Sequence, residues 1–337
     1  MKNNIKLGFT LSYDFVPPAL SHDLIEMLDN SVFTHVFVPE VWGYDAFLEC
    51  ARMADYSEKL IFGTGITNMY SRSPSTMAQA AASIFEQTDG RFILGLGLSG
   101  PKVIQNWHGM NYFDGSPMQR TREYLEIIRL ILSGEEVNYS GEMFKLEGFK
   151  LRTFKTPVNV PLYLAAFGEK NVQLAGELAD GWLPIWTSFP ELVDVRSNFE
   201  KGISKRNESL GSEVEISPYI VTCASEDIQQ AKLLVKHQLA FYIGQMGTYY
   251  ARIVEQYGFK TEVSRIIQAW QNGQKELAIN EVTDDMLARL AVVGSPDQVL
   301  TRYDILRENG VTLPVVWLPV KCPPSLALET INSFIEQ

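Results

Sequence analysis

Short apolar runs alternate with amphipathic segments along nearly the whole chain, and this alternation constrains the fold more than any other feature. Buried strands separated by crossover helices build a parallel sheet. The apolar runs predict eight strands, at residues 5–11, 34–40, 59–67, 91–98, 160–168, 180–186, 215–225 and 311–319. The segments between and after them predict helices at 21–30, 45–57, 74–88, 117–134, 170–178, 190–206, 227–258, 294–310 and from 326 onward.

The simplest closed arrangement of eight strand–helix units is a (β/α)8 TIM barrel, and we predict one such α/β domain over residues 1–337. A doubly wound open sheet is the alternative, but it would need fewer strands, and no G-x-G-x-x-G follows the first strand. Two insertions are expected, a hairpin near 137–151 and a mostly helical segment near 240–290. Ser21, Gly134 and the pair Ser295–Pro296 are the predicted helix ends.

The composition excludes several classes of function. A net charge of −11 repels phosphodiester backbones, so no nucleic-acid partner is expected. The chain has no apolar run of the roughly 18 residues that span a bilayer, and the apolar run within residues 1–11 is too short for a signal peptide. Its three cysteines form no C-x-x-C pair, and its four histidines have no metal-site spacing. We therefore predict no metal, no membrane association and a cytoplasmic protein with reduced, buried thiols.

Reactive groups of a TIM barrel lie at the carboxyl ends of its strands, and this rule turns the predicted strands into a short set of candidates. These are Glu40 and Trp42 after the second strand, Thr67 and Asn68 after the third, Gly97, Ser99 and Gly100 after the fourth, Gly168, Lys170 and Asn171 after the fifth, and Trp186 after the sixth.

Two of these segments have a backbone that suits a ligand. Glycines in residues 95–101 allow the chain to approach a flat ring, although a tight turn also favours glycine. Gly168 opens a predicted helix whose free N–H groups, with Lys170 and Asn171, would suit a phosphate. The alternative is an ordinary capped helix with a solvated lysine.

Three side chains are candidates for catalysis. Glu40 could act as an acid or base, or it could form a surface salt bridge. His108 could act as an acid or base, or it could be an ordinary polar loop residue. Trp42 could stack on a ring, whereas aromatic residues more often pack in a core or a lid.

Residues 63–109, from GTGITN through GLGLSGP to NWHG, resemble the luciferase-like monooxygenase superfamily. Residues 38–47, 120–144 and 161–184 match in the same order, so the resemblance covers most of the chain. The chain looks most like the branch that uses the deazaflavin coenzyme F420, which includes methylenetetrahydromethanopterin reductase-like proteins.

This resemblance implies a TIM barrel with insertions and a homodimer. It implies that Glu40, Asn68 and the loop Gly97–Gly100 contact the cofactor, and that Gly168 begins the phosphate turn. It also implies a cis peptide bond between Gly65 and Ile66. Sugar-phosphate dehydrogenases of the family carry a histidine where Val41 stands and a glutamate in the loop after strand four, which GLSGP lacks. Oxidation of glucose 6-phosphate is therefore not expected.

Three functions follow from the resemblance. The first is hydride transfer between coenzyme F420 and a small organic substrate, the second is an FMN-dependent monooxygenase using dioxygen, and the third is a non-catalytic flavin-binding accessory protein. An apolar or planar substrate is expected, because the predicted pocket is rich in aromatic residues. Its lining is Tyr13, Trp42, Tyr70, Trp107, Trp186 and parts of residues 240–290, although helix packing is the alternative for the aromatic run 241–250.

Overall fold

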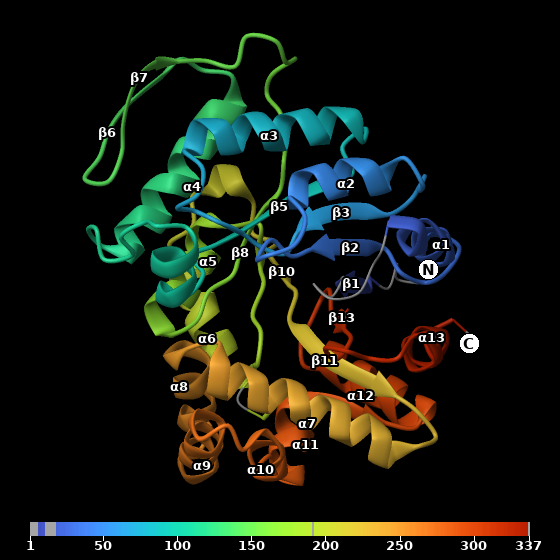
Figure 1. Ribbon diagram of the computed structural model, residues 1–337. Helices are drawn as coiled ribbons and strands as arrows, with labels where there is room; N and C mark the ends of the chain where they lie inside the picture. Colours follow the sequence, from blue (N-terminus) through green and yellow to red (C-terminus); the bar gives the residue numbers. More distant parts are fainter. Residues whose placement is uncertain (1–5, 11–17, 191, 336–337) are drawn as a thin grey trace. The chain divides into compact units, whose positions relative to one another are not determined.

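The computed structural model describes residues 6–10, 18–190 and 192–335, and it divides into two compact units (Figure 1). Unit I comprises Pro17–Leu183 and Val195–Ile216. Unit II comprises Met1–Val16, Pro184–Asp194 and Ser217–Gln337.

A parallel sheet forms the core of unit I, with neighbouring strands in the order β10-β9-β8-β5-β3-β2. A short strand, β4, pairs with β5 beyond the end of β3. β2, β5 and β8 are buried along their whole length, which explains why their sequences are nearly continuous apolar runs. The strands are β2 His35–Val38, β3 Ile61–Thr64, β4 Thr67–Asn68, β5 Phe92–Gly97, β8 Leu162–Leu164, β9 Gly181–Trp182 and β10 Glu215–Ile216.

Helices follow these strands, and three of them begin at a capping residue that the sequence supplies. Asp45 accepts hydrogen bonds from the first turn of α2, and Ser73 and Ser116 cap α3 and α4, each with a proline next to it. Gly134 ends α4 at φ 86°, as predicted. In Figure 1, α2 and α3 lie side by side over β3 and β5. The helices are α1 Pro18–Asp29, α2 Ala46–Ala54, α3 Pro74–Gln87, α4 Pro117–Ser133, α5 Glu169–Leu178 and α6 Leu192–Ile203.

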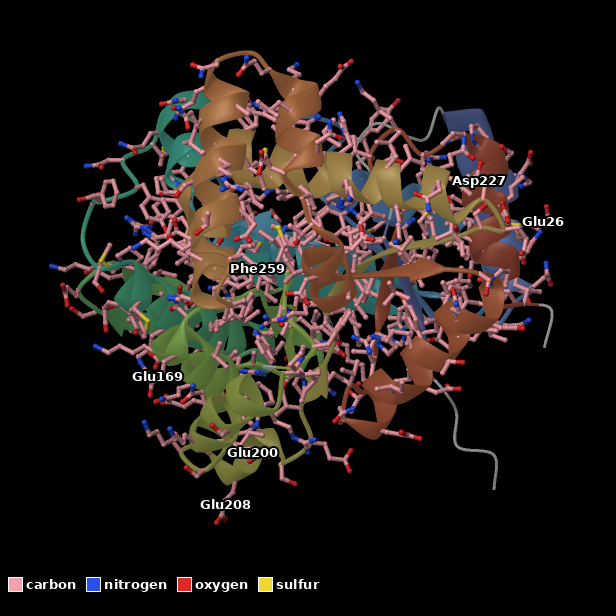
Figure 2. All side chains as sticks on the ribbon, turned by 90° about the horizontal axis from the view of Figure 1, so that it is seen from below. Glu26, Glu169, Glu200, Glu208, Asp227 and Phe259 are labelled. Carbon is pink, nitrogen blue, oxygen red and sulfur yellow. The ribbon has the colours of Figure 1, made fainter. Side chains whose placement is uncertain are left out.

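The surface of unit I carries part of the acidic excess of the chain. The side chains of Glu26, Glu169, Glu200 and Glu208 are exposed and point outward in Figure 2. These carboxylates keep their hydration, so their charge costs the fold little.

Where a hairpin insertion is expected, the chain forms the antiparallel pair β6 Val137–Ser140 and β7 Lys145–Phe149. Its turn is held by Glu123, a residue of α4 that is only 1% exposed. The Glu123 carboxylate accepts hydrogen bonds from Gln119 Nε2 at 2.9 Å and from three successive backbone N–H groups of the turn, at 2.8–3.0 Å. Burial alone would raise the pKa of Glu123, but these donors outweigh it and the pKa is lowered.

Glu123→Gln is expected to lower the free energy of unfolding by about 2 kcal/mol at pH 7, because a carboxamide has one acceptor oxygen and its NH2 group would face backbone donors. A carboxylate with a lowered folded pKa stabilises the fold above its unfolded pKa of about 4.3, and this stability is lost as the pH falls through the folded value. Urea unfolding at pH 7 and pH 3 should therefore show a difference from the wild type that shrinks in acid. Glu147→Gln, at an exposed position of β7, is the control and should change stability by less than about 0.5 kcal/mol. An equal loss at both pH values would contradict this role of the carboxylate.

Unit II contains a second set of parallel strands, in the order β1-β13-β11-β12. Where a mostly helical insertion is expected, residues between Thr248 and Leu290 form four helices in sequence. The elements are β1 Gly8–Thr10, β11 Tyr219–Ala224, α7 Ile228–Gln245, α8 Thr248–Gln256, α9 Lys260–Gln271, α10 Lys275–Asn280, α11 Asp284–Leu290, β12 Ala291–Gly294, α12 Pro296–Glu308, β13 Val315–Trp317 and α13 Pro324–Asn332. Ser295 caps α12 in a capping box with Gln298, at the predicted start.

Several predicted elements differ in the structure, among them the helix predicted at 227–258, which is the two helices α7 and α8. The strand predicted at 215–225 is two strands, β10 and β11, because Pro218 has no N–H with which to continue a ladder. β12 is not predicted as a strand, because a four-residue apolar run directly after a helix has no periodicity of its own. α1 begins at Pro18, so Ser21 lies inside the helix and is not its N-cap.

The expected α/β architecture with a parallel sheet is confirmed, but neither unit closes a barrel by itself. Within the described residues, the strands of unit I run in order from β10 to β2, and those of unit II run from β1 to β12. No helix in the described part of the chain is both long and apolar enough to cross a membrane. Cys50, Cys223 and Cys322 are buried, free thiols.

Candidate active site

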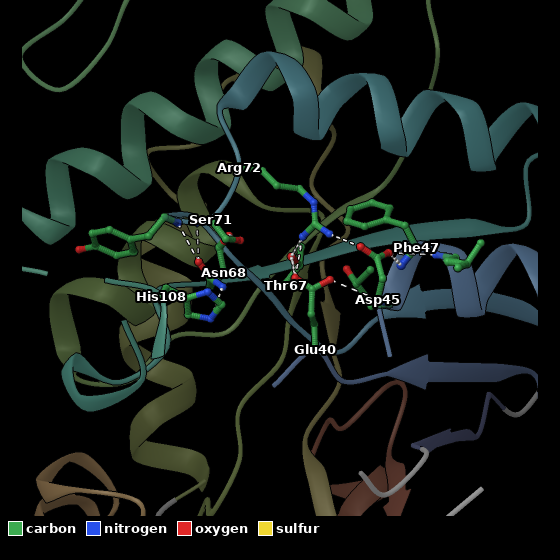
Figure 3. A network of polar contacts seen from close by, with 12 residues as sticks. Glu40, Asp45, Phe47, Thr67, Asn68, Ser71, Arg72 and His108 are labelled. Carbon is green, nitrogen blue, oxygen red and sulfur yellow. Dashed lines mark hydrogen bonds and ion pairs between the residues drawn. The ribbon is translucent and has the colours of Figure 1, made fainter. Parts of the chain in front are cut away.

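Glu40 follows β2 in unit I, and its carboxylate is bound by three donors (Figure 3). Oε1 accepts hydrogen bonds from Arg72 Nη1 at 2.6 Å and from Thr67 Oγ1 at 3.1 Å. Oε2 accepts one from the backbone N–H of Ala46 at 3.2 Å, at the start of α2. The side chain is 15% exposed. The carboxylate is therefore held in a fixed position, as an acceptor, at the junction of β2, β4 and α2.

Arg72 holds this junction together. Its Nη1 also donates to Thr67 Oγ1 at 3.1 Å, and its Nη2 donates to Asp45 Oδ2 at 2.5 Å. Its guanidinium lies over the ring of Phe47, with the central carbon 4.9 Å from the ring centroid. Burial would lower the pKa of Arg72, but the hydrogen bond and charge of Glu40, with those of Asp45, raise it. The sequence reasoning missed both Arg72 and Asp45, because neither immediately follows a predicted strand.

Asn68 ends β4 and is 2% exposed. Its Oδ1 accepts hydrogen bonds from the backbone N–H groups of Tyr70 at 3.0 Å and Ser71 at 2.8 Å, which forms an Asx turn. The other end of the amide faces the exposed side chain of His108, with Nδ2 and the imidazole Nε2 3.5 Å apart. The structure thus brings together two predicted site residues that are 40 positions apart in the chain.

The peptide bond between Gly65 and Ile66 is cis, as predicted for this position. It joins β3 to β4. The Gly65 N–H donates to the carbonyl of Val38 at 2.7 Å, and the Glu40 N–H donates to the carbonyl of Ile66 at 3.4 Å. The backbone of this link therefore runs directly beside Glu40.

The glycines of β5 and of the loop that follows it have different roles. A Cβ on Gly95 would lie 1.9 Å from the carbonyl oxygen of Thr64, and one on Gly97 would lie 2.8 Å from the side chain of Ile66. These two glycines are therefore required by close packing inside the sheet. A Cβ on Gly100 would meet no atom within 4 Å, and Ser99 adopts a left-handed φ of 60°. The open part of the loop is thus Ser99–Gly100.

Two indoles lie beside the polar cluster. Trp42 and Trp107 contact each other edge to face, with ring centroids 5.4 Å apart, and they are 47% and 45% exposed. Trp107 ends a π-helical turn, Val103–Trp107, that also positions His108. π-helical turns are rare and often lie at functional sites.

Most of the chain matches a known protein family. The family model for luciferase-like monooxygenases matches residues 16–313. The chain belongs to this family.

Relatives within the family include a putative coenzyme F420-dependent oxidoreductase of Mycobacterium tuberculosis, 30% identical and aligned over 94% of this chain and 96% of its own length. The 5,10-methylenetetrahydromethanopterin reductase of Archaeoglobus fulgidus is also 30% identical, over 96% and 97% of the two chains. These relatives confirm the resemblance to F420-dependent oxidoreductases.

Solved structures share the fold at lower identity. The coenzyme F420-dependent tetrahydromethanopterin reductase of Methanopyrus kandleri has a TM-score of 0.84 at 23% identity and covers 98% of both chains. A type II Baeyer–Villiger monooxygenase of Pseudomonas putida, in complex with FMN, has a TM-score of 0.70 at 16% identity and covers 98% of this chain and 97% of its own. The prediction of an enzyme of this superfamily is confirmed.

The segment that the family resemblance predicts to hold a phosphate lies at the start of α5. Gly168 adopts a φ of 73°, and no side chain caps the first turn. Lys170 is exposed and Asn171 is half-buried. Uncapped N–H groups and a neighbouring lysine have the chemistry that a phosphate requires, so this end of the helix fits the predicted role.

The predicted aromatic lining is only partly exposed. Tyr70 is buried, stacks on Tyr112 and donates its hydroxyl hydrogen bond to the Tyr112 carbonyl at 2.9 Å. Trp186 is buried in unit II against Tyr242 and Trp317. Tyr13 lies outside the described residues. Of the single residues named in the lining and described by the structure, Trp42 and Trp107 are exposed and the others are buried. Tyr242 of the run 241–250 is buried, which favours helix packing for that segment.

Proposed function

We propose that this protein is an F420-dependent oxidoreductase that transfers a hydride between the deazaflavin and a small organic substrate. The observation that carries the proposal is the cluster of Glu40, Thr67, Asn68 and His108 at the ends of β2 and β4, which lies within the segments that match the family (Figure 3). The F420-dependent names of the relatives support the choice of cofactor.

The cofactor would supply the hydride, and the residues of the chain would bind and orient it. Thr67 and Asn68 would border its ring. The backbone at the end of β5 and in the loop after it, at Gly97, Ser99 and Gly100, would border the same ring. Backbone N–H groups after Gly168, with Lys170 and Asn171, would hold its phosphate.

The substrate would meet the cofactor beside the exposed indoles and His108. Trp42 and Trp107 offer an apolar edge to a planar molecule. His108 is the exposed polar group of the cluster and is the candidate for hydrogen bonding to the substrate. Glu40 already accepts hydrogen bonds from three donors, so we assign it to positioning rather than to proton transfer.

The proposal also includes the closed (β/α)8 barrel, the homodimer and the cytoplasmic location expected from the sequence. Fold similarity to the Methanopyrus kandleri reductase supports the barrel. An FMN-dependent monooxygenase is the second candidate, and fold similarity to the FMN-bound Pseudomonas putida enzyme supports it.

Titration of the purified protein with F420 and with FMN tests the cofactor directly, with intrinsic tryptophan fluorescence as the readout. We expect F420 to bind at least about tenfold more tightly, a difference of about 1.4 kcal/mol. The control is Trp107→Phe, which should reduce the fluorescence change if the cofactor binds near the exposed indole pair. Tighter binding of FMN would favour the monooxygenase, and binding of neither would refute the cofactor assignment.

A further inference from the structure

The two ends of the Asn68 side chain are chemically distinct, and the structure determines which end faces His108. The backbone N–H groups of Tyr70 and Ser71 both point at Oδ1, at 3.0 and 2.8 Å. An amide turned the other way would bring its NH2 group against two N–H donors. The orientation of this amide is therefore determined by the turn, and Nδ2 must face outward.

An NH2 group that faces an imidazole determines which imidazole nitrogen carries the proton. Nδ2 of Asn68 is a donor only, so the facing Nε2 of His108, 3.5 Å away, can interact favourably only as an acceptor. A neutral imidazole with its lone pair on Nε2 carries its hydrogen on Nδ1. Within the described residues no hydrogen-bond partner is recorded for Nδ1, and the side chain is exposed.

We propose that Asn68 is a positioning residue that holds His108 in the Nδ1–H tautomer, so that His108 offers the substrate a neutral hydrogen-bond donor. The role of His108 as a hydrogen-bond donor to the substrate rests on the proposed function. It implies a substrate with an acceptor atom at the reacting centre, such as a carbonyl or imine group.

The chemistry of such a step balances with the cofactor as the reductant. As a hydride adds to the carbon of a C=O or C=N group, the π electrons of that bond move to the heteroatom. The Nδ1–H hydrogen bond stabilises the negative charge that develops there, and the heteroatom then takes a proton from water. His108 keeps its own proton throughout, and a neutral imidazole is able to polarise a carbonyl in this way.

Asn68→Asp is the sharpest variant for testing this tautomer. Aspartate keeps an oxygen for the N–H groups of Tyr70 and Ser71, so the turn is retained. It replaces the donor that faces His108 with an acceptor, which should draw the imidazole proton to Nε2. Circular dichroism and thermal unfolding would confirm that the variant is folded.

The first measurement is the ¹⁵N spectrum of histidine-labelled protein at pH 7.5, without cofactor. The chain has four histidines, and His108→Gln identifies the signals of His108 by their loss. We expect Nδ1–H in the wild type and Nε2–H in Asn68→Asp. His22, which contacts Asp23 at 3.3 Å, should not change and is the internal control. Nε2–H in the wild type, or the same tautomer in both proteins, would overturn the proposal.

The second measurement is turnover of two His108 variants with F420 and a carbonyl or imine substrate. The amide nitrogen of asparagine falls near the position of Nδ1, and that of glutamine falls near Nε2. We expect His108→Asn to keep at least about tenfold more kcat/KM than His108→Gln, or about 1.4 kcal/mol of transition-state stabilisation. The reverse order would refute donation from Nδ1. Absence of turnover in the wild type would refute the proposed function while leaving the tautomer result intact.

Discussion

Gly95→Ala is expected to destabilise unit I by about 4 kcal/mol or more, a large part of the roughly 5–15 kcal/mol by which a protein is ordinarily stable. The new Cβ would lie 1.9 Å from the carbonyl oxygen of Thr64 and 3.1 Å from Leu183 Cδ1, where backbone and core side chains leave no room. The substitution would also break the two hydrogen bonds between the Thr64 hydroxyl and the Gly95 backbone, at 2.7 and 2.9 Å. Urea unfolding followed by circular dichroism would measure the loss.

Gly100→Ala is the matched control, five residues along the same segment. A Cβ there meets no atom within 4 Å, and Gly100 is not among the residues with positive φ. Its free energy of unfolding should change by less than about 0.5 kcal/mol, or rise slightly because alanine has fewer unfolded conformations. Similar losses in the two variants would show that the close contact at Gly95 does not determine stability.

The sequence predicts much of the sheet because its strands are buried on both faces. β2 and β5 coincide with their predicted apolar runs to within a few residues, since continuous apolar sequence between turns has few other solutions. The hairpin after α4 could be predicted from its alternating pattern. β12 could not, because Ala291–Gly294 follows α11 without a turn and its identity depends on pairing with β11.

The residues of the candidate site also fall into two groups, those that the sequence predicts and those that it does not. Glu40, Thr67 and Asn68 could be found from sequence, because the carboxyl ends of parallel strands meet at one edge. Arg72 could not, because its role depends on contact with Glu40, 32 residues away, and with Asp45, 27 residues away. The contrast between Gly95, packed against Thr64, and the open Gly100 also depends on neighbours that sequence alone does not place.

Arg72→Met is expected to lower the free energy of unfolding by about 3 kcal/mol, because it leaves the carboxylate of Glu40 partly buried and without its counter-ion. Methionine preserves much of the apolar contact with Phe47, so the loss reports on charge rather than on volume. Arg52→Met is the control: it removes an ion pair with Glu49, three residues earlier on α2, and should lower the free energy of unfolding by less than about 1 kcal/mol.

The double variant Arg72→Met/Glu40→Gln separates the two explanations for such a loss. If the single variant suffers from an uncompensated carboxylate, neutralising Glu40 should recover about 2 kcal/mol of the loss in urea unfolding. If Arg72 mattered only through its packing on Phe47, the second substitution would add to the first. Recovery would also show that the fold tolerates the negative charge of Glu40 because Arg72 compensates it. Its carboxylate would then orient Thr67 and the start of α2, and the exposed His108 would be left to face the substrate.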